Sequence, residues 1–219
     1  MRKLFLLPAA AFLMLALSSV ARADAVIIGN STGSQATATI SYTFNAATNT
    51  FTFTITNTSP FDARITGIGF DLAAGDVTKN LNQSTGIDGF SSSNVAGFTF
   101  RDAEALGNVP QFNNAVLDFG WTTGNSGNFN GGSPNDGLDN DPGSNSLTFS
   151  VSSTAFQGMS ADAIASAIYV RFQRVGPDGR DSDVGTANVI PEPISMLLLG
   201  SGLAGVALKA RRRKQEQAD

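Results

Sequence analysis

The residues with the clearest chemical potential are three aspartates in a polar stretch of the chain. The segment NDGLDNDPG places Asp136, Asp139 and Asp141 within six positions, beside two asparagines. Carboxylates this close repel one another unless a cation or solvent screens them, and Ca²⁺ takes about six to eight oxygen ligands from such groups. The three aspartates are therefore candidate Ca²⁺ ligands, although their spacing differs from that of an EF-hand loop. Solvated Asx turns in a polar loop suit these residues well, so no cofactor is expected, and a Ca²⁺ site is the alternative.

A second acidic segment, GPDGRDSD, carries Asp178, Asp181 and Asp183. Its two glycines and its proline already predict a tight turn after a strand, since these residues supply the backbone angles that turns need. A second Ca²⁺ site is the weaker interpretation of this segment.

The chain contains no histidine and no cysteine. This excludes Ser-His-Asp and Cys-His nucleophiles and the usual zinc, copper or haem sites, and it leaves a fold without disulfides. A glycosidase needs only two carboxylates, but no pair stands out. Glu104 lies in RDAEALG, which is typical of a surface turn or a short helical stub. Trp121 is in phase with Leu117 and Phe119, which favours core packing over sugar stacking. We therefore expect a protein that is not an enzyme.

The segment between Asp24 and Ile190 is strongly acidic. It holds six Lys and Arg against fifteen Asp and Glu, a net charge of −9. Nucleic-acid binding depends on Lys and Arg that neutralise phosphates. A nucleic-acid partner is not expected.

The elements that must position these residues are short strands, because apolar residues alternate with Thr and Ser along much of the chain. The five residues NAATN between the first two clear strands predict a hairpin loop. One helix is expected in MSADAIASAI, where Ser160 can act as N-cap and Asp162 lies in the first turn. About eight strands are predicted, with strong alternation in segments 40–44, 51–55, 117–121, 147–151 and 168–172 and weaker signals in 26–28, 66–72 and 98–100.

Strands that carry hydroxyl groups on one face and Phe on the other are typical of antiparallel sheets with one solvated side. Two such sheets bury their phenylalanines against each other. The fold class expected is therefore all-β, an antiparallel β-sandwich with one short helix. The stretch 122–146, rich in Gly, Asn, Ser and Asp, is expected to be a long polar loop.

The N-terminal residues have the pattern of a secretory signal peptide. Arg2 and Lys3 precede an apolar stretch, and Ala21 and Ala23 supply the small residues that signal peptidase reads. Cleavage is expected before Asp24. An uncut anchor is the weaker alternative, because the apolar stretch is short for a bilayer crossing of about 20 residues.

The C-terminal residues combine a proline motif, an apolar run and a basic cluster. Pro191, Glu192 and Pro193 are expected to be extended, because each proline sets its own φ and disfavours the α region at the preceding residue. The fifteen residues from Ile194 to Leu208 carry no charge and would span about 22 Å as a helix, against a hydrocarbon core of about 30 Å. The basic cluster, which includes Arg211, Arg212 and Arg213, predicts a cytoplasmic end. The alternatives are a simple membrane anchor and a helix-packing face of small residues.

This three-part tail resembles the PEP-CTERM sorting signal of Gram-negative bacteria. The resemblance implies export across the inner membrane, recognition by an exosortase, removal of the tail near the PEP segment, and delivery to the cell surface or extracellular matrix. It also implies an association with exopolysaccharide and biofilm. The family pattern often has a small or polar residue after the second proline, where this chain has Ile194.

The resulting organisation is a signal peptide at 1–23, an exported domain at 24–188, a sorting signal with its membrane helix at 189–214, and a tail at 215–219. The partners expected are signal peptidase, exosortase, transiently the inner membrane, and extracellular polysaccharide. For the exported domain, a structural or adhesive surface role is expected first. A Ca²⁺-dependent carbohydrate-binding module is the alternative, and a carboxylate-type glycoside hydrolase comes third.

Overall fold

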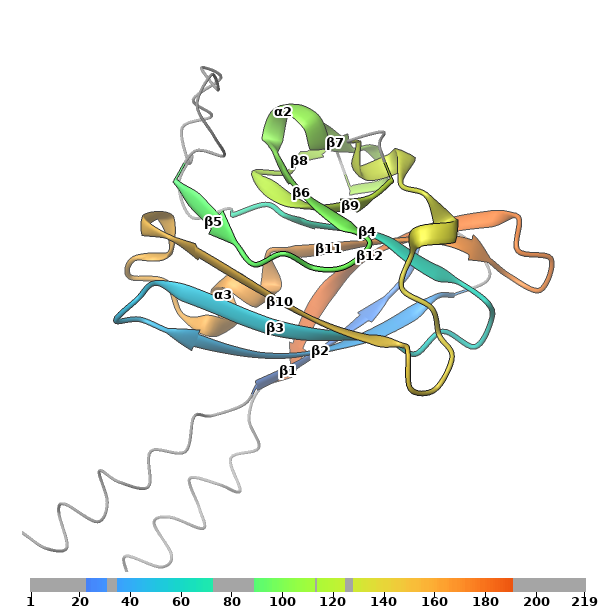
Figure 1. Cartoon of the computed structure of the whole chain (residues 1–219), viewed down its shortest axis with the longest axis horizontal. Helices are drawn as coiled ribbons and strands as arrows, with labels where there is room; N and C mark the ends of the chain where they lie inside the picture. The colour runs from blue at the N-terminus through green and yellow to red at the C-terminus, as the bar shows by residue number, and fades with distance from the viewer. Residues whose placement is uncertain (1–22, 31–34, 73–88, 113, 125–127, 191–219) are drawn as a thin grey trace, which may run out of the picture. The chain divides into compact units, whose positions relative to one another are not determined.

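The computed structural model describes residues 23–30, 35–72, 89–112, 114–124 and 128–190 (Figure 1). The chain divides into two units, Met1–Val189 and Ile190–Asp219. The description below concerns the first unit, called the body here, together with the last residue of its final strand.

Ten strands of the body form a single sheet in the order β5-β10-β3-β2-β1-β12-β11-β4-β9-β6. Every pairing for which a register is described is antiparallel. The strands are β1 (Ala23–Ile28), β2 (Thr37–Asn45), β3 (Thr50–Asn57), β4 (Arg64–Phe70), β5 (Phe90–Ser92), β6 (Phe98–Asp102), β9 (Phe119–Thr123), β10 (Ser146–Ser153), β11 (Ile168–Val175) and β12 (Asp181–Ile190). A separate two-stranded sheet pairs β7 (Asn108–Val109) with β8 (Ala115–Val116).

Alternation of side chains decides which face of each strand is buried. In β3, Phe51, Phe53 and Ile55 are buried while the threonines between them remain partly accessible. The same pattern holds in β2 and β10, which pair with β3 on either side. The predicted hairpin loop between β2 and β3 is confirmed, and within it Asn49 takes a φ of 48°, a region that asparagine tolerates better than most residues.

One hydrophobic core joins residues from both halves of the sheet. The Phe53 ring of β3 lies 5.9 Å from Trp121 of β9 and 5.7 Å from Phe70 of β4, between ring centroids. Phe149 of β10 lies 5.1 Å from Trp121. The sheet therefore curls over its own core. The expected antiparallel β fold is confirmed, but the two separate sheets of a sandwich are replaced by one continuous sheet, because β1 and β12 pair in its middle.

The two edge strands of this sheet, β5 and β6, lie close to one another in the sequence. Strand β9, the neighbour of β6, contacts the other edge strand: Trp121 Nε1 of β9 donates a hydrogen bond of 3.0 Å to Ser92 Oγ of β5. The Phe90 ring of β5 lies 4.3 Å from Phe119 of β9. These contacts bring the two ends of the sheet together.

Helix α3 (Ala161–Ser166) is the helix expected from the sequence. The Ser160 hydroxyl accepts the backbone N–H of Ala163 at 3.1 Å, as an N-cap does. Asp162 lies in the first turn and accepts a 3.0 Å hydrogen bond from the Tyr42 hydroxyl of β2. The four-residue α2 (Ala103–Leu106) contains Glu104, so the expected helical stub is present.

A smaller apolar cluster covers the outer face of β4 and β11. Leu117 belongs to this outer cluster and not to the main core, so the expectation that it shares a face with Phe119 and Trp121 is wrong. A Cβ atom at Gly69 would lie 2.4 Å from Leu117 Cδ1, so a larger residue at this position would require the Leu117 side chain to move. The buried members of the outer cluster are Leu106, Val109, Leu117, Phe129 and Val184.

The strand β12 was not expected from the sequence. It forms a hairpin with β11 and pairs with β1 on its other side, where Asn30 N donates to Val184 O at 3.2 Å. It ends at Ile190, so Val189 and Ile190 lie in a strand, and Pro191 follows directly. At the other end of the body, β1 begins at Ala23.

Within the described ranges, no helix is long and apolar enough to cross a bilayer. The segment expected to do so, residues 194–208, lies outside the described residues, and so does the predicted signal peptide up to residue 22.

Candidate functional site

The aspartate-rich segment lies in the long connection between β9 and β10. Two short 3-10 helices, η2 (Phe129–Gly131) and η3 (Pro134–Asp136), give this connection local structure. Leu138 then pairs with Ile65 at the start of β4, through backbone hydrogen bonds of 3.0 and 2.9 Å. The connection is therefore attached to the sheet in the middle of its acidic segment.

The side chain of Asn57, at the end of β3, stabilises this attachment through hydrogen bonds. It is fully buried. Its Nδ2 donates to the carbonyl oxygens of Ala63, at 2.7 Å, and Leu138, at 3.0 Å. Its Oδ1 accepts the N–H of Ser59 at 3.2 Å. One amide group thus joins the β3–β4 turn to the acidic segment.

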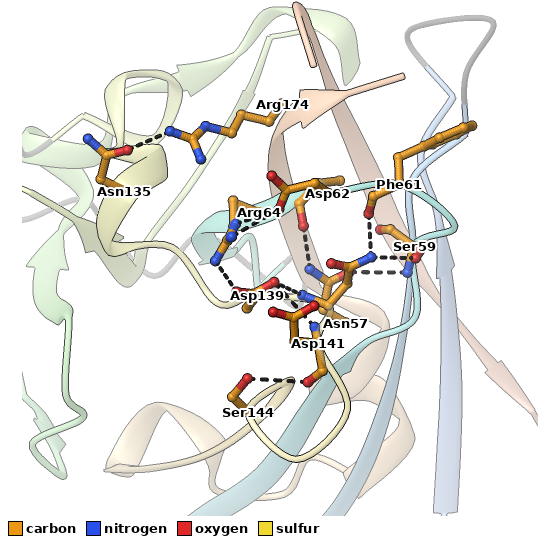
Figure 2. Close-up of polar contacts among 12 residues, drawn as sticks. Asn57, Ser59, Phe61, Asp62, Arg64, Asn135, Asp139, Asp141, Ser144 and Arg174 are labelled. Atoms are coloured by element: carbon orange, nitrogen blue, oxygen red, sulfur yellow. Dashed lines mark hydrogen bonds and ion pairs between the residues drawn. The ribbon is translucent and has the colours of Figure 1, made fainter. Parts of the chain in front are cut away.

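An ion pair between Arg64 and Asp139 makes the second connection (Figure 2). Arg64 also pairs with Asp62 at 2.9 Å. The side chains of Arg64 and Asp139 are each 20% exposed, whereas Asp62 is 65% exposed, so solvent screens the Asp139 pair less than the Asp62 pair. The second oxygen of Asp139 accepts the N–H groups of Asn140 at 2.7 Å and Asp141 at 3.2 Å, which is an Asx turn.

The three predicted Ca²⁺ ligands have different surroundings. Asp139 faces a guanidinium, while Asp136 and Asp141 are exposed. Among the described residues, no three acidic side chains gather in a group suited to a metal ion. A Ca²⁺ ion that used Asp139 would have to compete with Arg64. Ca²⁺ binding by Asp136, Asp139 and Asp141 stays a prediction.

Arg174 extends the polar contacts to the neighbouring strand. It lies at the bulge in β11 between Gln173 and Val175, has a φ of 56°, and donates from its guanidinium to Asn135 Oδ1 (Figure 2). Arg64 and Arg174 therefore both hold the connection between β9 and β10. The sequence contains no local signal for either contact, because the partners are separated by 75 and 39 positions.

The second acidic segment is the turn of the β11–β12 hairpin. Gly179 N donates to Gly176 O at 3.1 Å, as expected of a tight turn. Its three aspartates do not face a common point, because Asp178 and Asp181 are exposed and Asp183 is fully buried. Asp183 accepts the N–H groups of Val184 at 3.0 Å and Ala36 at 3.4 Å, which ties β12 to the chain before β2.

Arg171, on the outer face of β11, is the most buried cation among the described residues, at 8% exposure. Burial lowers the pKa of its guanidinium, and the negative charge of Asp183 opposes that shift. Its Nε is buried without a hydrogen-bond partner, as are Thr66 Oγ1, Asn130 Oδ1 and Gln173 Oε1. Buried polar atoms of this kind are commonly satisfied by ordered water.

Tyr169 lies two residues before Arg171 on the same face of β11. Its ring packs edge-on against Phe112, with 5.3 Å between the centroids. Burial raises the pKa of its phenol, and the negative charge of Asp71 raises it further.

The structure also places the residues considered for carbohydrate chemistry. Trp121 is fully buried among Phe53, Phe70 and Phe149, so its predicted core role is confirmed and it offers no platform to a sugar. Glu104 lies in α2 at the end of β6, and its side chain lies outside what the structure describes.

The comparisons with known proteins concern the C-terminal end of the body and the residues after it. The family described as "PEP-CTERM protein-sorting motif" matches residues 189–213. The chain carries a PEP-CTERM sorting motif. The match spans Pro191, Glu192, Pro193 and the three arginines at 211–213, and it confirms the resemblance drawn from the sequence. No curated protein and no solved structure matches the chain.

The PEP-CTERM match begins at Val189, so it includes the last two residues of β12. The motif implies that the protein is exported and processed by an exosortase. Its proline-glutamate-proline and arginine residues lie outside the described residues, and Ala21 of the predicted signal cleavage site does too, whereas Ala23 is the first residue of β1.

Proposed function

We propose that this protein is a non-enzymatic component of the cell surface or extracellular matrix of a Gram-negative bacterium. In this proposal the PEP-CTERM motif holds the protein in the inner membrane until an exosortase removes the tail. The body then contributes a structural or adhesive module associated with exopolysaccharide. The match of the motif to residues 189–213 carries the proposal.

The body supports this role in three ways. It has a net charge of −9 between Asp24 and Ile190, which suits a soluble exported protein. It needs no disulfide, because one large aromatic core joins both halves of its sheet. The chain also lacks the histidine and cysteine on which Ser-His-Asp and Cys-His nucleophiles and the usual zinc, copper and haem sites depend.

The sorting step is tested by mass spectrometry of the C-terminus of the protein recovered from the surface fraction. We expect a new terminus near Pro191–Pro193 in the wild type and accumulation of the uncut chain when Glu192→Ala alters the motif. Glu216→Ala is the matched control, because it removes the same side chain outside the matched residues. An intact Asp219 in the surface fraction of the wild type would contradict processing.

The matrix role is tested separately, in cells that process the protein correctly. We expect the mature protein to stay with the matrix after washing and to be released when the exopolysaccharide is removed enzymatically. Recovery of all mature protein in the medium of an untreated culture would argue against a structural or adhesive role.

A further inference from the structure

The outer face of β2, β3 and β10 carries a regular array of hydroxyl groups, called the hydroxyl grid here. The strand registers place these residues in three rows that cross the three strands. The rows are Thr43–Thr52–Ser150, Ser41–Thr54–Thr148 and Thr39–Thr56–Ser146. All nine side chains are hydroxylic, and none of them is buried. Figure 1 shows the three strands lying next to one another.

The grid is ordered by its own contacts and by the core beneath it. Hydroxyl-to-hydroxyl hydrogen bonds join Thr52 to Ser150 at 3.1 Å, Thr54 to Thr148 at 2.8 Å and Thr56 to Ser146 at 2.7 Å. Threonine is β-branched and has few χ1 choices, and the residues between the threonines of β3 are fixed in the core. A hydroxyl has one donor and two acceptor sites, so each pair retains capacity for a further partner.

The charge of the grid sets it apart from the rest of the body. None of the nine side chains carries a charge, although the segment from Asp24 to Ile190 has a net charge of −9. The grid therefore offers no cation that could bind an anionic polymer. It also contains no carboxylate that a neutral partner would have to desolvate.

The shape and composition of this face restrict the partner further. Small molecules bind in concave sites that cover most of their surface, whereas the grid is the accessible face of three paired strands. Stable protein interfaces have apolar, aromatic-rich centres in which serine is depleted, unlike this array. With strands about 4.8 Å apart and rows about 6.8 Å apart, the grid covers about 10 Å by 14 Å, which suits an extended chain rather than a single sugar.

We propose that the hydroxyl grid binds a neutral polysaccharide chain laid across β2, β3 and β10. This inference rests on the proposed matrix function and names the ligand class and the face that would serve it. Sugar hydroxyls would use the remaining donor and acceptor sites of the grid, and the threonine methyl groups would contact the C–H faces of the rings. Single contacts of this kind are weak, but a polymer that meets several copies of the protein gains by multivalency.

The test is co-sedimentation of the full chain, kept in mild detergent, with three neutral polymers: cellulose, starch granules and cross-linked dextran. Immobilised alginate serves as the anionic comparison. The grid variant is Thr54→Val with Thr148→Val, which removes the central pair and keeps the β-branched shape that strands favour. The matched control is Thr99→Val with Thr186→Val, which makes the same change on β6 and β12. A second grid variant, Thr148→Glu, places a charge in the central row.

We expect the wild type and the control to bind at least one neutral polymer and not alginate. The double grid variant should bind about tenfold more weakly, since it loses two hydroxyl partners, and Thr148→Glu should lose binding. Unchanged melting midpoints will show that the variants fold. Binding to none of the three polymers, or equal binding by grid and control variants, would overturn the proposal. Grid-dependent self-association or ice shaping without polysaccharide binding would overturn it as well.

The C-terminal mass spectrum separates this inference from the proposed function. If the protein is processed at the PEP-CTERM motif and retained by the matrix but binds no neutral polymer, only the grid assignment is wrong. If processing does not occur, the proposed function fails independently of the grid.

Discussion

Replacing Asn57 by alanine tests whether one buried amide holds the acidic segment to the sheet. The substitution removes two donated hydrogen bonds, of 2.7 Å to Ala63 O and 3.0 Å to Leu138 O, and one accepted from Ser59 N at 3.2 Å. Asn57 is fully buried, so water does not freely replace the lost groups. The substitution is therefore expected to lower the free energy of unfolding by more than an ordinary surface substitution does.

The expected loss of stability depends on which buried polar groups the substitution leaves without a hydrogen-bond partner. Leu138 O still accepts from Ile65 N at 3.0 Å, so most of the cost falls on Ala63 O and Ser59 N. A buried polar group left without its partner costs about 1–3 kcal/mol. Asn57→Ala should therefore lower the free energy of unfolding by about 2–4 kcal/mol.

The assay is urea denaturation of residues 24–190, followed by the fluorescence of the single tryptophan, Trp121. With a slope of about 1–3 kcal/mol/M, the midpoint should fall by about 0.7 M or more with the slope unchanged. Asn188→Ala is the control, because Asn188 is exposed on β12 and its replacement should cost less than about 0.5 kcal/mol. A midpoint for Asn57→Ala equal to that of the control would refute the reasoning.

Three further predictions follow from contacts described above. Burial raises the pKa of Tyr169, so the stability that its neutral phenol contributes is complete below the unfolded value of about 10 and declines as the pH rises beyond it; Tyr169→Phe should flatten this decline in melts between about pH 9 and 11. Arg64 neutralises Asp139, so millimolar Ca²⁺ should raise the melting midpoint of Arg64→Gln more than that of the wild type, and equal shifts would contradict the competition. Residues 24–190 should fold cooperatively whereas residues 24–180, which lack β12, should not; a cooperative melt of the shorter chain would show that the strand is dispensable.

Much of the fold could be predicted because alternation is a local property. In β2, β3, β10 and β11 the period-two pattern predicted both the strand and its buried face. The capping serine and the acidic first turn predicted α3 equally well. These signals need no knowledge of what the segment packs against.

The strand β12 could not be predicted in the same way. Its sequence, DSDVGTANVI, has a glycine in its middle and a fully buried aspartate near its start. Asp183 is stable there because backbone N–H groups from two segments bind its carboxylate. Because β12 was not predicted, nothing in the sequence indicated that β1 and β11 belong to one sheet, and two sheets were expected.

The surroundings of the acidic segment also depend on distant partners. The aspartates at 136, 139 and 141 were visible as a cluster, but the guanidinium of Arg64 and the amide of Asn57 come from β4 and β3. No spacing rule connects residues so far apart. The hydroxyl grid, in contrast, was present in the sequence as outward Thr and Ser, but its rows required the strand registers.

The pairing of β1 with β12 has a consequence for the order in which the body is completed. These strands come from opposite ends of the body and lie next to each other in the middle of the sheet (Figure 1). Until β12 is available, β1 has an unpaired edge on that side, and such edges favour association with other chains. Because the PEP-CTERM match begins within β12, closure of the sheet and arrival of the sorting signal coincide. The last two residues of the strand that completes the sheet are thus also the first two residues of the matched motif.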